Sequence, residues 1–184
     1  MSLLHFDLMK SFSIIFCFLF SLSLSAQIKE PNALKAGFGI SRFIEEKINT
    51  PTLLIAFNKD FYPNTFVEIS AEWAMPVDVS TDEELRELSS YRFGMNLFYK
   101  VLDEPNQAFN AGVGFSAGFY GLDYTILASD EQDYTIEFNP GFSALIEYNY
   151  ILSSQWFFGG RASIARYDAN RSNWMLGTVL GLRF

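Results

Sequence analysis

Hydrophobic residues alternate with small or polar residues along most of the chain after residue 30. The clearest run is 109–120, where Phe109, Val113 and Phe115 fall on one face while glycine, serine and asparagine dominate the other. A period of two residues places successive side chains on opposite faces of a β-strand, whereas a helix would mix the two sets around its surface. The alternation therefore predicts a strand over 109–120.

The same alternation recurs along the chain and predicts eight strands in all. They cover residues 35–43, 53–59, 65–75, 91–101, 109–120, 136–150, 156–165 and 173–184. Most are near the roughly 9–11 residues that a tilted strand needs to cross a membrane. An even number of antiparallel strands can close without exposed edges. We therefore predict an all-β fold, an eight-stranded antiparallel up-and-down transmembrane β-barrel.

The predicted connections alternate between short and long. Residues 60–64, 102–108 and 151–155 read as tight turns, whereas 76–90 and 121–135 are long and acidic. Outer-membrane barrels place short turns in the periplasm and longer loops outside. The phase of this alternation predicts that both termini are periplasmic. It also makes loops 76–90 and 121–135 the candidate contact surface for partners outside the cell, with a short helix expected within 80–88.

Composition indicates which solvent lies outside the barrel. Charged residues make up 18% of the chain, compared with about 25% in ordinary soluble domains. The second face of the strands is rich in glycine, serine and asparagine, which suits the narrow lumen of an eight-stranded barrel. A soluble barrel of lipocalin type would instead point large apolar side chains inward and charges outward. The large apolar face is therefore predicted to contact membrane lipid.

Aromatic residues gather near the ends of the predicted strands, as expected of the two interfacial girdles of a membrane barrel. Those expected at the outer side are Trp73, Tyr91, Phe119, Tyr134 and Trp174, and those at the periplasmic side are Tyr99, Phe109, Tyr148, Tyr150, Trp156 and Phe184.

Charged residues of both signs interrupt the small-residue face. Buried charges need partners, so we predict a salt-bridged network that plugs the lumen. The predicted network consists of Glu68, Glu72, Arg92, Lys100, Glu137, Glu147, Arg161 and Arg183.

Residues 1–26 have the pattern of a cleaved secretory signal peptide. Lys10 precedes an apolar run over 11–24, and Ala26 supplies a small residue before the expected cleavage at Gln27. An N-terminal membrane anchor is the alternative, but the apolar run is short for a spanning helix. The prediction is a signal peptide over 1–26 and a barrel domain over 27–184.

The chemistry of the predicted mature chain is limited. His5 and Cys17 are the sole histidine and cysteine, and both lie in the predicted leader. Disulfides, cysteine nucleophiles, histidine triads and histidine or cysteine metal sites are therefore not expected. The acidic residues within 82–87 lack the spacing of a calcium loop, and a net charge of −8 argues against nucleic acid. We expect no cofactor, no metal and no enzymatic activity.

The chain ends in a strand of alternating apolar residues with a terminal aromatic, formed by Trp174, Leu176, Thr178, Leu180, Leu182 and Phe184. This strand resembles the C-terminal recognition strand of outer-membrane proteins. Residues 30–184 as a whole resemble the small OmpA/OmpX-like family, the outer membrane protein beta-barrel domain. The resemblance implies localisation in the outer membrane, contact with its lipid, and recognition of the last strand by the barrel-assembly machinery.

Two functions remain open at this stage. The first is a structural or surface-interaction barrel with a plugged lumen. The second is a small transport or ligand-binding barrel for a small apolar molecule. Packing of the lumen separates the two hypotheses, because opposed charges along the axis support the first and a continuous apolar void would support the second.

Overall fold

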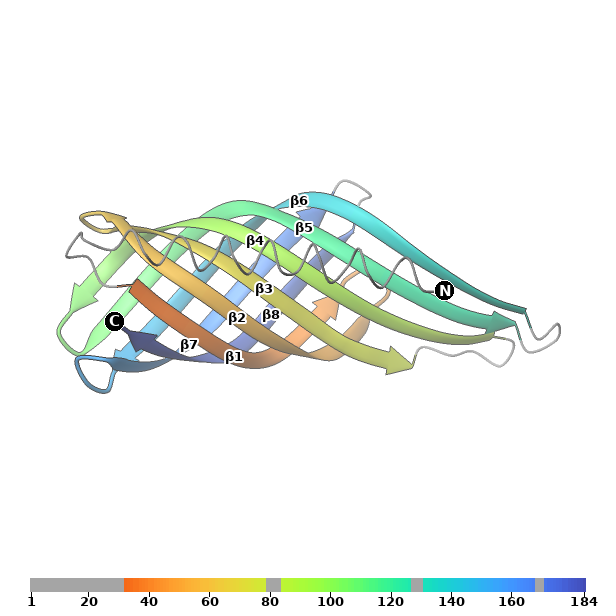
Figure 1. Cartoon of the computed structure of the whole chain (residues 1–184), viewed down its shortest axis with the longest axis horizontal. Helices are drawn as coiled ribbons and strands as arrows, with labels where there is room; N and C mark the ends of the chain where they lie inside the picture. Colours follow the sequence, from red (N-terminus) through yellow and green to blue (C-terminus); the bar gives the residue numbers. More distant parts are fainter. Residues whose placement is uncertain (1–31, 79–83, 127–130, 168–170) are drawn as a thin grey trace, which may run out of the picture. The chain divides into compact units, whose positions relative to one another are not determined.

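Eight antiparallel strands close into one barrel, with each strand paired to its neighbours in sequence and β1 paired to β8 (Figure 1). The computed structural model describes residues 32–78, 84–126, 131–167 and 171–184; the predicted signal peptide lies outside them. The strands are β1 (Asn32–Phe43), β2 (Ile48–Tyr62), β3 (Thr65–Asp78), β4 (Glu84–Glu104), β5 (Gln107–Ile126), β6 (Glu131–Ile151), β7 (Trp156–Tyr167) and β8 (Ser172–Arg183). Within these ranges no helix is long and apolar enough to span a membrane.

The alternation in the sequence becomes the two faces of the barrel wall. On β1, Phe38 and Ile40 are more than half exposed on the outside, whereas Ser41 faces the lumen and is buried. Strand β2 is apolar on both faces over 53–57, which explains its weak alternation in sequence. Its inward residue Leu54 packs in the lumen against Met175 and Val179. The predicted fold class is confirmed, with large apolar side chains outward.

The prediction of long loops at 76–90 and 121–135 was wrong. Strand β3 continues to Asp78 and β4 begins at Glu84, while the β5–β6 hairpin remains paired up to Ile126 and Glu131. Residues 84–88 are therefore strand, not the expected short helix. The apolar pattern stops before the strand does, because backbone pairing continues where neither face has to contact lipid. Hydrophobic periodicity locates only the lipid-facing part of each strand.

Strands on one side of the barrel extend well beyond the others. Strands β4, β5 and β6 have 21, 20 and 21 residues, whereas β1, β7 and β8 have 12 each. Pairing of β6 with β7 begins only at Gly141. Residues 84–90, 119–126 and 131–140 are here named the β4–β6 extension. They project at the end of the barrel (Figure 1, right) opposite Asn32 and Phe184, which pair with each other and are here named the barrel termini.

Candidate functional site

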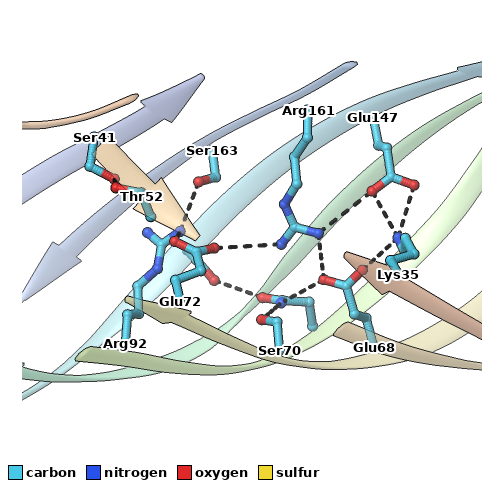
Figure 2. Close-up of polar contacts among 12 residues, drawn as sticks. Lys35, Ser41, Thr52, Glu68, Ser70, Glu72, Arg92, Glu147, Arg161 and Ser163 are labelled. Carbon is cyan, nitrogen blue, oxygen red and sulfur yellow. Dashed lines mark hydrogen bonds and ion pairs between the residues drawn. The ribbon is translucent and has the colours of Figure 1, made fainter. Parts of the chain in front are cut away.

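Charged side chains from five strands meet inside the barrel. The group, here named the lumen network, consists of Lys35 on β1, Glu68 and Glu72 on β3, Arg92 on β4, Glu147 on β6 and Arg161 on β7. Every one of these side chains is at most 6% exposed. Figure 2 shows how they point toward one another from opposite walls. Three cations face three carboxylates, so the network is balanced in formal charge.

Glu68 lies between two cations. Its Oε2 accepts from Lys35 Nζ at 2.6 Å, and its Oε1 accepts from Arg161 Nη1 at 2.7 Å. Lys35 also donates to both carboxylate oxygens of Glu147, at 2.9 and 2.8 Å. Arg161 Nη1 is 3.5 Å from that same carboxylate. Charges this deeply buried are stable only when paired and hydrogen-bonded, and these contacts tie β1, β3, β6 and β7 together.

Arg92 forms the second half of the network. Its guanidinium is bonded to Glu72 and also donates to Asn173 Oδ1 at 3.1 Å and to Ser163 Oγ at 2.9 Å. Arg161 Nη2, 3.8 Å from Glu72 Oε1, connects the two halves. The bonds of Arg92 reach from β4 to β7 and β8, so the network crosses the whole lumen.

Apolar layers lie on both sides of the charges. Toward the end opposite the termini, Phe43 and Tyr120 pack edge-to-face at 5.7 Å, and Tyr120 and Tyr167 at 5.6 Å. Toward the termini, Phe66 and Phe98 stack with centroids 4.7 Å apart. These rings are buried, whereas Glu147 also lines a cavity of about 160 Å³ at the mouth near Arg183.

Glycine makes room for the lumen aromatics. A Cβ added at Gly181 would lie 2.0 Å from the Phe157 ring, and one at Gly112 would lie 2.8 Å from the Phe98 ring. Contacts this short require a neighbour to move. The small residues on the inward face of the strands thus leave space for a few large side chains in the lumen.

Three members of the predicted charge network lie elsewhere. Lys100 pairs with Asp60 at 2.6 Å, where the two side chains are 20% and 17% exposed. Glu137 is 43% exposed and binds Arg171 at 2.7 Å at the opposite end. Arg183 lies over the Phe157 ring at 5.4 Å. The structure therefore brings together Glu68, Glu72, Arg92, Glu147 and Arg161, and places Lys100, Glu137 and Arg183 toward the ends.

Sequence reasoning missed Lys35. It is the first residue of the strand predicted over 35–43 and shares the inward face with Gly37, Gly39 and Ser41. The signal was present in the alternation, since positions two apart lie on one face. Asn173 and Ser163, which bond Arg92, carried no charge signal in the sequence.

The last strand closes the barrel. Strand β8 pairs with both β1 and β7, and the Phe184 amide donates to the Asn32 carbonyl at 2.9 Å. Trp174, Leu176, Leu180 and Phe184 are 37–62% exposed on the outer surface. The outward row is thus open to lipid, and its recognition by the assembly machinery stays a prediction.

Aromatic residues lie on the outer surface near both ends of the barrel. Trp73 and Tyr91 stack with centroids 6.2 Å apart, on the side away from the termini. Tyr99, Tyr148 and Trp156 are 44–55% exposed near the opposite end. The side chain of Tyr134 lies outside the described residues.

Comparison with known proteins places the fold. No protein-family model and no curated protein matches the chain, but solved structures do. Ail, the attachment invasion locus protein of Yersinia pestis, matches with a TM-score of 0.61 at 12% identity, covering 85% of this chain and all of Ail.

Two further structures match the same region. Neisserial surface protein A matches with a TM-score of 0.62 at 9% identity, over 84% of this chain and 97% of that one. A major outer membrane protein of Thermus thermophilus matches with a TM-score of 0.64 at 13% identity, over 85% of this chain and 100% of that one. The closed eight-stranded barrel, its apolar outer surface and these neighbours agree with the predicted outer-membrane location. The chain has the fold of the small OmpA/OmpX-like outer-membrane β-barrels.

Proposed function

We propose that this outer-membrane barrel is a plugged, non-conducting protein that makes contacts at the cell surface through the β4–β6 extension. The observation that carries the proposal is the extension itself, because ten residues of β6, 131–140, pair with β5 but not with β7. A strand edge without a partner offers backbone donors and acceptors to another chain.

The filled lumen supports the same proposal. Opposed buried charges and stacked rings occupy the axis where a pore would run. At the mouth near the termini, a cavity of about 160 Å³ has both polar and apolar lining, including Asp60, Lys100 and Arg183. This lining does not favour a transport barrel for a small apolar molecule.

Charge suggests the kind of partner. Residues 121–135 contain Asp123, Asp130, Glu131 and Asp133 and no lysine or arginine. We therefore expect a partner with a basic surface, and contacts that weaken as salt rises. One structural neighbour is named for attachment and invasion. For this chain, the proposal of a contact role rests on the β4–β6 extension.

Trimming the hairpin tests the proposal. Replacing residues 123–134 with an Asn-Gly turn keeps the Leu122–Thr135 pair and supplies a favoured two-residue hairpin. Cells producing the full or the trimmed barrel are compared for aggregation and for adherence to surfaces coated with basic or acidic proteins. The two kinds of cells are matched for the amount of folded barrel in the outer membrane, which is measured by its SDS mobility shift. We expect adherence to basic protein only with the full barrel; equal adherence with both would contradict the proposal.

Orientation is tested separately. A protease site after Asp130 lies between β5 and β6, and one after Asn106 lies in the β4–β5 turn at the other end of the barrel. In intact cells, protease is expected to cleave only the first. Cleavage of only the second would place the extension in the periplasm and remove the surface-contact role.

A further inference from the structure

A groove of about 720 Å³ lies on the outer surface of β3–β6. Its walls include the outward side chains Leu97, Val113, Phe115 and Phe142, which are 51–68% exposed. The floor is the strand backbone around Gly114. The groove faces bilayer hydrocarbon and is lined almost wholly by apolar atoms. A lipid acyl chain therefore matches it in chemistry.

A second hollow adjoins this groove. It measures about 390 Å³ and shares Phe115 and Phe142 with the first, adding Pro140 and Arg166. The two shared rings lie 5.1 Å apart between their centroids. Phe142 and Arg166 are direct partners in the β6–β7 ladder. The two hollows thus lead from the apolar groove past the ring pair to a guanidinium group.

Arg166 is an outward-facing cation at the loop end of the barrel wall. It is the penultimate residue of β7 and pairs with Ser172, the first residue of β8. Its side chain is exposed, and it makes no ion pair with any residue whose side chain the structure describes, a set that leaves out 84–87 and 122–135. An arginine on the lipid face costs least near the membrane interface. Guanidinium groups bind phosphate through paired, charge-assisted hydrogen bonds.

We propose that the two hollows form one binding site for an anionic phospholipid, with an acyl chain in the groove and the phosphate at Arg166. The apolar lining selects the chain, and the single positive charge selects the headgroup. A lipid with net negative charge is favoured over a zwitterionic lipid, whose own ammonium compensates its phosphate. The site goes beyond the proposed surface-contact role and does not depend on it.

Headgroup selection is tested by charge removal. The purified barrel in detergent is titrated with phosphatidylglycerol or with phosphatidylcholine of the same chains, and retained lipid is counted by native mass spectrometry. Arg166→Gln is expected to weaken phosphatidylglycerol binding about tenfold, since a hydrogen bond to a charged group contributes at least about that factor. Phosphatidylcholine binding is expected to change little. The control Arg42→Gln removes an outward charge at the same end of β1, away from the groove, and should leave both affinities unchanged.

Chain binding is tested by filling the groove. Val113→Phe places a ring in it, whereas Ile55→Phe adds the same ring to the outward face of β2. Val113→Phe is expected to weaken the binding of both lipids, whereas Ile55→Phe is expected to leave the binding of both unchanged. The SDS mobility shift verifies that each variant is folded. Equal phosphatidylglycerol affinity in Arg166→Gln and Arg42→Gln, or full affinity in Val113→Phe, would overturn the proposal. So would a dimer that Val113→Phe abolishes, because it would assign this surface to a second copy.

Discussion

Replacing Arg161 with alanine removes the cation of the lumen network that lies within 3.8 Å of all three carboxylates. Its Nη1 is 2.7 Å from Glu68 and 3.5 Å from Glu147, and its Nη2 is 3.8 Å from Glu72. Two cations, Lys35 and Arg92, would then face three carboxylates in a lumen where these side chains are at most 6% exposed.

The expected loss follows from leaving a buried charge without its partner. Breaking a buried ion pair by truncating one side costs about 3–5 kcal/mol, whereas a solvent-exposed pair contributes about 0–1 kcal/mol. Arg161→Ala should therefore lower the free energy of unfolding by roughly 3–5 kcal/mol. Lys100→Ala breaks the Lys100–Asp60 pair, whose side chains are 20% and 17% exposed; because water reaches this pair, its loss should cost clearly less than that of Arg161.

Urea unfolding of the barrel refolded in lipid vesicles measures both losses. Arg161→Met separates charge from packing, because it keeps a long side chain while removing the guanidinium; it should lose nearly as much as alanine. The double variant Arg161→Ala with Glu68→Ala should lose less than the sum of the two single variants. Small and equal losses for Arg161→Ala and Lys100→Ala would refute the reasoning and indicate that water reaches the lumen charges.

Three further predictions use the same unfolding assay or the amount of assembled barrel. Gly114→Ala places a Cβ 2.3 Å from a carbonyl oxygen of β4 and should be clearly destabilising, whereas Gly160→Ala, with nothing nearer than 4.0 Å, should be tolerated; equal effects would argue against the strand packing. A double-mutant cycle on the stacked pair Trp73 and Tyr91 should give a coupling of about 0.5–1.5 kcal/mol, and zero coupling would dismiss the contact. Phe184→Ser should lower the amount of barrel assembled in cells while leaving the refolded protein nearly as stable, and an unchanged amount would count against an assembly signal.

The lipid-facing wall could be predicted from the sequence because hydrocarbon imposes a rule. Outward positions between the interfaces are mostly apolar, so residues such as Phe38, Ile40, Val113 and Phe115 make the strand period visible in the sequence. The same rule no longer applies above the membrane. Glu87 lies opposite Asp123 in the β4–β5 ladder. Two acidic residues at such positions do not mark the strand period, so the sequence suggested loops where the structure has strands.

The lumen could be predicted only in part. The alternation along the strands identified Glu68, Glu147 and Arg161 as inward-facing, and these three residues meet at the centre. The alternation gives the face of a residue but not its position along the barrel axis. Lys100 and Glu137 share the inward face, yet they lie toward opposite ends. Which charges meet depends on the stagger between strands, and that quantity is set by the whole closed sheet.

Single-channel recording in planar bilayers tests the plugged lumen most directly. The refolded protein, shown to be inserted by its SDS mobility shift, is recorded beside Arg161→Ala and Lys100→Ala. The lumen network and the aromatic layers on both sides of it predict no stable conductance for the wild-type protein or Lys100→Ala, and transient openings for Arg161→Ala if it inserts. Long-lived conductance steps from the wild-type barrel would contradict the account, because they would require a continuous water path past Glu68 and Arg161.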